Sequence, residues 1–88
     1  MKALIQKWGK LENLQVYQEA FRKLFDLDNS TLNTLVYQGI PEWDSISHME
    51  LMTILEQAFS IEMDIDDIID FSSFEQGKEI LTKYGIKF

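Results

Sequence analysis

Residues 42–59 read EWDSISHMELMTILEQAF, and they carry a clear helical pattern. From Ser45 onward the apolar residues recur at spacings of three and four, which predicts an amphipathic helix that ends near Phe59. With roughly 100° of rotation per residue, one arc of this helix gathers the side chains that should face a core. The residues expected on that buried arc are Leu51, Met52, Ile54, Leu55, Ala58 and Phe59.

Two apolar residues near the start of this helix fall outside the arc. Ile46 and Met49 lie on the polar side, framed by Glu50 and Glu56, which should face solvent. The two residues could pack beneath the preceding loop, or they could form a small exposed contact patch. Because a regular helix cannot turn them towards the core, we predict the exposed patch.

The rest of the chain predicts more helices and no strand. Helical spacing runs over residues 11–25, a short helix fits 65–70, and a last helix begins at the capping-box pattern of 72–75 and stops at Gly85. The long connection 26–43 has room for a short helix after Ser30. The expected fold class is all-α, a small four-helix bundle with three longer helices, a short third helix and a long loop between the first two. The core outside residues 45–59 should include Leu14, Tyr17, Phe21, Leu24, Leu32, Leu35, Val36, Ile40, Trp43, Phe74, Leu81 and Tyr84.

Length and composition limit the organisation of the protein. With 88 residues, we expect one domain over 1–88, of which residues 1–10 could form an N-terminal extension. The absence of cysteine excludes disulfides and thiolate metal sites. No apolar run approaches the roughly 20 residues of a membrane span, and the start MKALIQKWGK lacks the features of a secretory signal. We therefore expect a cytoplasmic protein that does not span a membrane, and a monomer.

The net charge of −7 is distributed unevenly along the chain. Between Leu24 and Gly77 there is no lysine or arginine, so the acidic residues of this middle part are unbalanced. Such a field repels nucleic acid and would steer a basic protein surface towards the chain. The acids concerned are Asp26, Asp28, Glu42, Asp44, Glu50, Glu56, Glu62, Asp64, Asp66, Asp67, Asp70 and Glu75.

Ser45 stands out at the start of the 45–59 helix. Asp44 is placed to cap this helix, so Ser45 would sit at the positive end of the helix dipole, where an attached anion is favoured. A catalytic serine needs an oriented base, but the only histidine, His48, lies on the apolar side of the helix, and no Gly-x-Ser-x-Gly elbow is present. Ser45 is therefore predicted to be an attachment point in a protein that is not an enzyme.

A metal site is the other chemistry that the acids suggest. Asp64, Asp66, Asp67 and Asp70 lie close together in sequence, but the calcium-loop pattern fails, because Ile69 occupies the position that requires glycine. We expect no metal.

The segments around Ser45 together resemble the acyl carrier protein family. The resemblance rests on DSI at 44–46, the helix HMELMTILEQAF after it, and IEMDIDDIIDFSSFEQGKEIL at the expected spacing, and it covers roughly residues 14–85. PEWDSISHMEL at 41–51 is more similar to stand-alone carriers of specialised pathways than to those of fatty acid synthesis, which usually have small residues before the Asp-Ser pair. Thr53 also stands where many carriers have another apolar contact residue.

The resemblance implies that Ser45 carries 4′-phosphopantetheine, installed from coenzyme A by a phosphopantetheinyl transferase. The arm holds an acyl group as a thioester and presents it to acyl-loading and acyl-transferring enzymes with basic docking surfaces. The family assigns partner contacts to Asp44, Ile46, Met49, Glu50 and Glu56. Two alternatives stay open: an aminoacyl or peptidyl carrier, and a small acidic protein-interaction module without a prosthetic group.

Overall fold

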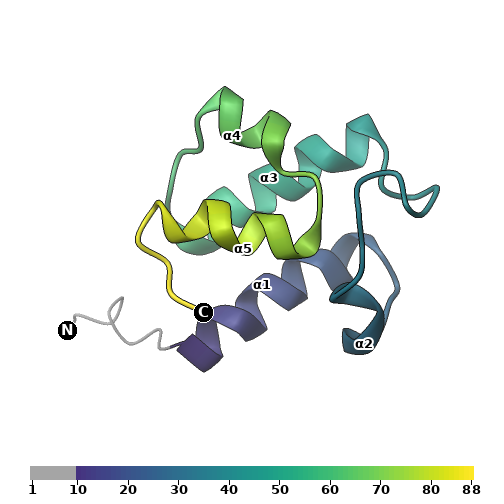
Figure 1. The fold of residues 1–88 in the computed structure, drawn as a ribbon, viewed down its shortest axis with the longest axis horizontal. Coiled ribbons are helices and arrows are strands. Elements are labelled where there is room, and N and C mark those ends of the chain that lie inside the picture. Colours follow the sequence, from purple (N-terminus) through teal and green to yellow (C-terminus); the bar gives the residue numbers. More distant parts are fainter. Residues whose placement is uncertain (1–9) are drawn as a thin grey trace.

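The structure is a computed structural model that describes residues 10–88 and is built of helices. The predicted all-helical class is confirmed, and the only β contact among these residues is an isolated bridge between Val36 and Ser73. Apart from Lys10, the N-terminal extension expected over residues 1–10 lies outside the described range. In chain order the helices are α1 (Lys10–Leu24), α2 (Asn29–Leu32), α3 (Ser45–Phe59), α4 (Ile65–Asp70) and α5 (Phe74–Thr82) (Figure 1).

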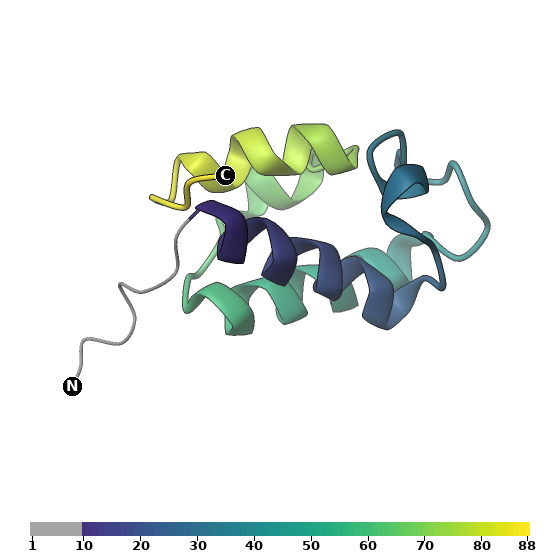
Figure 2. The ribbon, with the colours of Figure 1, turned by 90° about the horizontal axis from the view of Figure 1, so that it is seen from below.

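The three longer helices, α1, α3 and α5, run along the long axis of the molecule (Figure 2). The short helix α2 and its flanking loops lie across one end, while α4 lies beside α3 and α5, away from α1 (Figure 1). The C-terminus returns to the start of α1, where the side-chain amide of Asn13 donates a hydrogen bond to the Lys87 carbonyl at 2.9 Å. None of the helices within residues 10–88 is both long and apolar enough to cross a membrane.

Aromatic side chains from distant segments meet at the centre of the core. The Tyr17 ring of α1 lies 4.7 Å from the Phe74 ring of α5, and its hydroxyl donates to the Phe74 carbonyl at 2.7 Å. The ring centroids of Phe21 and Trp43 lie 5.6 Å apart in an edge-to-face arrangement, which is favourable for aromatic pairs. From α3 the core receives Leu51, Met52 and Leu55, all fully buried or nearly so.

Most residues predicted for the core are buried or half-buried, and two are exposed. Ala58 is exposed, because it lies at the edge of the α3 stripe in the last turn, next to the half-buried Ile54. Val36 is exposed because its backbone pairs with Ser73 while its side chain points outward. The other partial burials are Leu14, Leu24, Ile40, Phe59 and Tyr84.

The connection between α1 and α3 contains the short helix α2, for which the sequence left room after Ser30, although the helix begins at Asn29; with it the described chain has five helices, one more than the four of the expected bundle. Asp28 caps α2 by accepting a hydrogen bond from the Thr31 N–H at 3.0 Å. After α2 the chain reaches the start of α5, where the Tyr37 N–H donates to the Ser72 carbonyl at 2.8 Å. The predicted long loop is thus fixed near its start and in its middle by ordinary capping and backbone hydrogen bonds.

The boundaries of α3 and α4 agree with prediction, whereas those of α5 differ. The N-cap of α5 is Ser73, which accepts the Gln76 N–H at 2.9 Å, so the cap lies one residue later than the pattern at 72–75 suggested. The helix ends at Thr82 and not at Gly85. A turn then follows, in which Gly85 adopts a φ of 90°, a conformation that favours glycine.

Candidate functional site

The start of α3 presents Ser45 to solvent. Asp44 is the N-cap residue, and its Oδ1 accepts the Ser47 N–H at 2.9 Å. This hydrogen bond holds the pKa of the Asp44 carboxyl below its usual range, so the cap is charged at neutral pH. Ser45 is the first residue of the helix, is exposed, and its hydroxyl forms no hydrogen bond within residues 10–88. The hydroxyl is therefore accessible for modification.

The one histidine of the chain, His48, forms contacts with residues other than Ser45. The Trp43 indole N–H donates to Nδ1 of His48 at 3.0 Å, and Nε2 of His48 lies 2.8 Å from the Ile68 carbonyl. The tautomer with its hydrogen on Nε2 satisfies both contacts at once. His48 is half-buried, in keeping with its place on the apolar side of the helix, and neither ring nitrogen is left to take a proton from Ser45.

A hollow of about 350 Å³ opens beside Ser45, between α3 and α4. Its walls are mostly aliphatic and aromatic. Three of the lining residues carry a hydroxyl group: Tyr37, Ser45 and Ser72. Such a hollow can accept an apolar group attached near Ser45. The lining residues are Tyr37, Ser45, His48, Met49, Ile65, Ile68, Ile69, Phe71 and Ser72.

The exposed apolar patch predicted on α3 is present. Ile46 is 75% exposed and Met49 is 50% exposed, which confirms that neither side chain belongs to the core. The patch continues onto α4, where Ile65 and Ile69 are also exposed and share the hollow with Met49, a continuation that the helical pattern of α3 did not predict. The helical spacing of these two isoleucines can be seen in the sequence, but the sequence does not indicate which side of α4 faces solvent.

The two glutamates expected to frame this patch have different surroundings. Glu50 is exposed and forms no ion pair within the described residues. Glu56, predicted to face solvent, is half-buried, and its Oε2 accepts the Met63 N–H at 2.9 Å. The chain reverses after α3 through Ser60, at a φ of 56°, and so brings Met63 back onto Glu56. The prediction for Glu56 is wrong to this extent, since its carboxylate fixes the α3–α4 loop.

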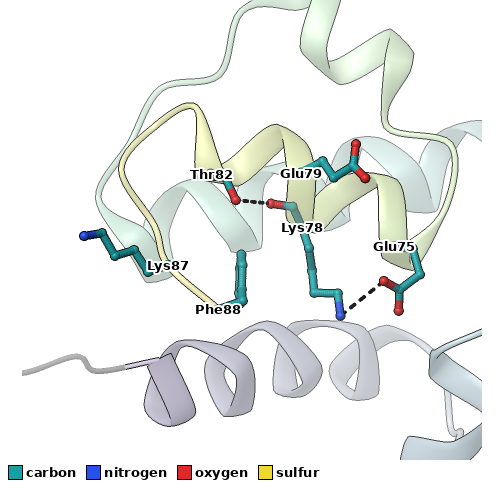
Figure 3. Close-up of a pocket in the computed structure, with 6 residues that line it drawn as sticks. All are labelled: Glu75, Lys78, Glu79, Thr82, Lys87 and Phe88. Carbon is teal, nitrogen blue, oxygen red and sulfur yellow. Dashed lines mark hydrogen bonds and ion pairs between the residues drawn. The ribbon is translucent and has the colours of Figure 1, made fainter.

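A second hollow lies along α5 and the C-terminal segment, as Figure 3 shows. Its volume of about 500 Å³ exceeds that of the hollow beside Ser45, but its walls contain no histidine, cysteine or serine. Lys78 is paired there with Glu75 at 3.3 Å, and the Thr82 hydroxyl donates to the Lys78 carbonyl at 2.8 Å. The lining residues are Glu75, Lys78, Glu79, Thr82, Lys87 and Phe88. Nothing in these walls indicates chemistry, so the hollow beside Ser45 is the better candidate.

The acids of the α4 region form no metal site among the residues that the structure describes. Asp67 instead points inward, where the Lys83 ammonium contacts Oδ1 at 2.6 Å and the Tyr84 hydroxyl donates to Oδ2 at 2.6 Å. The hydrogen bond from Lys83, which has the larger effect, and that from Tyr84 hold the pKa of the Asp67 carboxyl below its usual range.

Comparisons with protein-family models, with curated proteins and with solved structures found no match to this chain.

Proposed function

We propose that this protein is a carrier that bears a covalent 4′-phosphopantetheine arm on Ser45. More particularly, it is a stand-alone acyl carrier protein of a specialised pathway. The observation that carries the proposal is the position of Ser45. This residue is the first of a capped helix of 15 residues, and its exposed hydroxyl lies at the edge of an apolar hollow. The resemblance of residues 14–85 to acyl carrier proteins assigns the modification to this residue.

The helix arrangement supports this class. Three longer helices with a short helix before the last one are compatible with the four-helix bundle that the resemblance implies, and α2 adds one turn in the long connection. In such a bundle Ser45 lies at the junction of that connection and α3. A site built at the end of a rigid helix keeps the attached arm at a fixed starting point.

The surroundings of Ser45 fit a phosphate ester. The N-terminus of α3 carries partial positive charge, and backbone N–H groups there favour an attached anion. Asp44 accepts one of these N–H groups and fixes the turn in which Ser45 stands. When attached, 4′-phosphopantetheine supplies a terminal thiol that carries the acyl group as a thioester.

The chain itself is proposed to be non-catalytic. Both nitrogens of His48 are engaged by Trp43 and Ile68, so no general base is directed at Ser45. The enzymes that install the arm, load it and use its cargo must supply the chemistry. Their basic surfaces would meet Asp44, Ile46, Met49 and Glu50, while Glu56 acts behind this surface by holding the α3–α4 loop.

The hollow beside Ser45 favours an acyl cargo over an aminoacyl or peptidyl one. Side chains of Met49, Ile65 and Ile69 offer contact to a hydrocarbon, but no carboxylate lines the hollow to pair with a cationic amine. Loading octanoyl and aminoacyl forms onto the arm compares the two directly. The octanoyl form should shift the amide signals of these residues and raise the melting temperature more than the aminoacyl form does.

The modification is tested by incubating the protein with coenzyme A and a broad-specificity phosphopantetheinyl transferase. Intact-mass analysis should show the addition of one phosphopantetheine, located on Ser45 by fragmentation. Ser45→Ala should accept none, while Ser47→Ala, two residues along the same turn, should be modified like the wild type. If the wild type is not modified while a control carrier is, the carrier proposal fails and the small acidic interaction module becomes the preferred function.

A further inference from the structure

Helix α4 is attached to the rest of the bundle by polar contacts at two places. On the side of Ser45, Nε2 of His48 contacts the Ile68 carbonyl at 2.8 Å, and this is the only hydrogen bond between α3 and α4 in the described part of the chain. On the other side, the Asp67 carboxylate is bound by two side chains that follow α5. Because α4 has six residues and two of its three isoleucines are exposed, these polar contacts have a large share in holding it in place.

The contact between α3 and α4 requires a neutral imidazole ring. Nδ1 of His48 accepts the Trp43 indole N–H at 3.0 Å, so Nδ1 carries no hydrogen, and Nε2 is the nitrogen that donates to Ile68. Trp43 is fully buried, and its indole N–H has no other acceptor within residues 10–88. The ring therefore serves both neighbours only while it lacks a second proton.

Protonation of His48 would break this arrangement. Histidine side chains take up a proton between about pH 8 and about pH 5, and the charged ring carries hydrogen on both nitrogens. Nδ1–H would then face the Trp43 N–H, which leaves a buried donor without its acceptor. The charged ring would gain a cation–π contact with Trp43, but at a ring distance of 6.0 Å this gain is smaller than the loss of a buried hydrogen bond.

A charged His48 would also lack an anion beside it. Tyr37 is the titratable side chain in ring contact with His48, with the ring centroids 5.1 Å apart. No carboxylate among residues 10–88 forms an ion pair with His48. The acids on the two helices that His48 joins, and at the cap of α3, are Asp44, Glu50, Glu56, Asp64, Asp66, Asp67 and Asp70.

The hollow beside Ser45 gives the charged ring a way to reach water. His48 is one of the residues that line this hollow, so the ring can turn towards it without crossing the core. Such a turn releases Trp43 and Ile68 together. Water that enters the hollow can then accept the Trp43 N–H.

We propose that His48 is a positioning residue that holds α4 against α3 at neutral pH, and that its protonation releases α4 and widens the hollow beside Ser45. The closed state excludes a proton that the open state binds, so the closed state is favoured as the pH rises and is lost as the pH falls. The inference rests on the proposed function in that the hollow is where the carried acyl group would lie. The contact between α3 and α4 itself belongs to the unmodified chain.

The first test is an NMR titration of the unmodified protein from about pH 8 to about pH 5.5. The chain has one histidine, so its Cε1–H signal reports the protonation of His48, and Trp8→Phe leaves Trp43 as the only source of an indole signal. Both signals should move with one common midpoint. Over the same range the amides of 65–71 should lose about tenfold in protection against hydrogen exchange, corrected for the intrinsic rate, while those around Phe21 in α1 should not.

Two variants show which group takes up the proton. His48→Gln can accept from Trp43 and donate to Ile68 without a titrating ring, so the pH dependence of protection at 65–71 should disappear. Tyr84→Phe, the matched control, removes contacts at the other end of α4, so it should lower this protection at every pH and keep the pH dependence. A Trp43 signal that does not follow the His48 titration, an equal pH response in His48→Gln, or an equal loss of protection in α1 would overturn the inference.

A neutral apolar probe, N-phenyl-1-naphthylamine, tests the widening of the hollow. Its fluorescence with the unmodified wild type should rise as the pH falls through the His48 titration, and it should stay constant with His48→Gln. Constant fluorescence with the wild type would overturn the link between His48 and the hollow. All these measurements use the unmodified protein, so a failure to attach phosphopantetheine would end the carrier proposal and leave them valid.

Discussion

The indole N–H of Trp43 donates a hydrogen bond to Nδ1 of His48 at 3.0 Å, with the two rings 6.0 Å apart and inclined by 23°. Trp43 is fully buried, so His48 supplies the acceptor for its only side-chain donor. Through its other nitrogen, His48 contacts the Ile68 carbonyl of α4. One side chain therefore connects the loop before Ser45, the first turn of α3 and α4.

Replacing His48 should destabilise the protein through this connection. His48→Leu leaves the Trp43 N–H without an acceptor, which should lower the free energy of unfolding by about 1–3 kcal/mol. His48→Gln can both accept and donate, and it should recover part of the loss. Urea unfolding followed by tryptophan fluorescence measures both variants. Equal stability of His48→Leu and wild type would contradict the structural role of the Trp43–His48 hydrogen bond.

The difference between core and patch on α3 can be measured with a pair of alanine variants. Leu55 is fully buried, so Leu55→Ala should cost about 2–5 kcal/mol of unfolding free energy. Ile46 is 75% exposed, and Ile46→Ala should change stability by no more than about 0.5 kcal/mol. Similar losses in both variants would show that Ile46 packs against the protein in solution.

Gly77→Ala should destabilise the protein even though alanine is the better helix former. A Cβ atom at Gly77 would overlap Cζ of Phe71 and the hydroxyl oxygen of Tyr17, both of which are buried. Overpacking of this kind costs about 1–3 kcal/mol, which exceeds the gain of up to about 1 kcal/mol in helix propensity. Thermal unfolding by circular dichroism should therefore show a lower melting temperature. A melting temperature at or above that of the wild type would mean that the Tyr17–Phe71 contact relaxes freely.

Acid should destabilise the protein partly through Asp67. Hydrogen bonds from Lys83 and Tyr84 lower the pKa of this carboxyl from 3.8, so the charged form stabilises the fold above that unfolded value. The contribution is lost as the pH falls through the lowered pKa. The urea midpoint should thus drop below about pH 4, and less steeply in Asp67→Asn, which has no proton to bind at this position. Identical acid slopes for the two proteins would exclude Asp67 as a source of the pH dependence.

Glu50 and Glu56 should respond differently to substitution. Glu50→Lys reverses an exposed charge and should lower kcat/KM with a phosphopantetheinyl transferase, with a weaker salt dependence and unchanged stability. Glu56→Ala leaves the Met63 N–H without its acceptor and should cost about 1–3 kcal/mol of stability. Kinetics across a salt series together with urea unfolding separates the two effects. A normal stability for Glu56→Ala would restore the interpretation of Glu56 as a free surface acid.

Local sequence was sufficient to place the helices and the start of the site. The bounds of α3 and α4 follow from apolar spacing and from caps such as Asp44, since helix hydrogen bonds and caps join residues only a few positions apart. The same geometry turned Ile46 and Met49 away from the core. The exposure of Ser45 at the first position of α3 follows from the cap before it.

Only the tertiary structure decided the orientation of α4 and the role of Glu56. The sequence IDDIID allows either its isoleucines or its central aspartate to face inward, and the choice depends on Lys83 and Tyr84, which follow Asp67 by 16 and 17 residues. The partner of Glu56 is a backbone N–H that reaches it only because the chain reverses at Ser60. These contacts join residues that no local periodicity relates, so they exist only once the helices have packed.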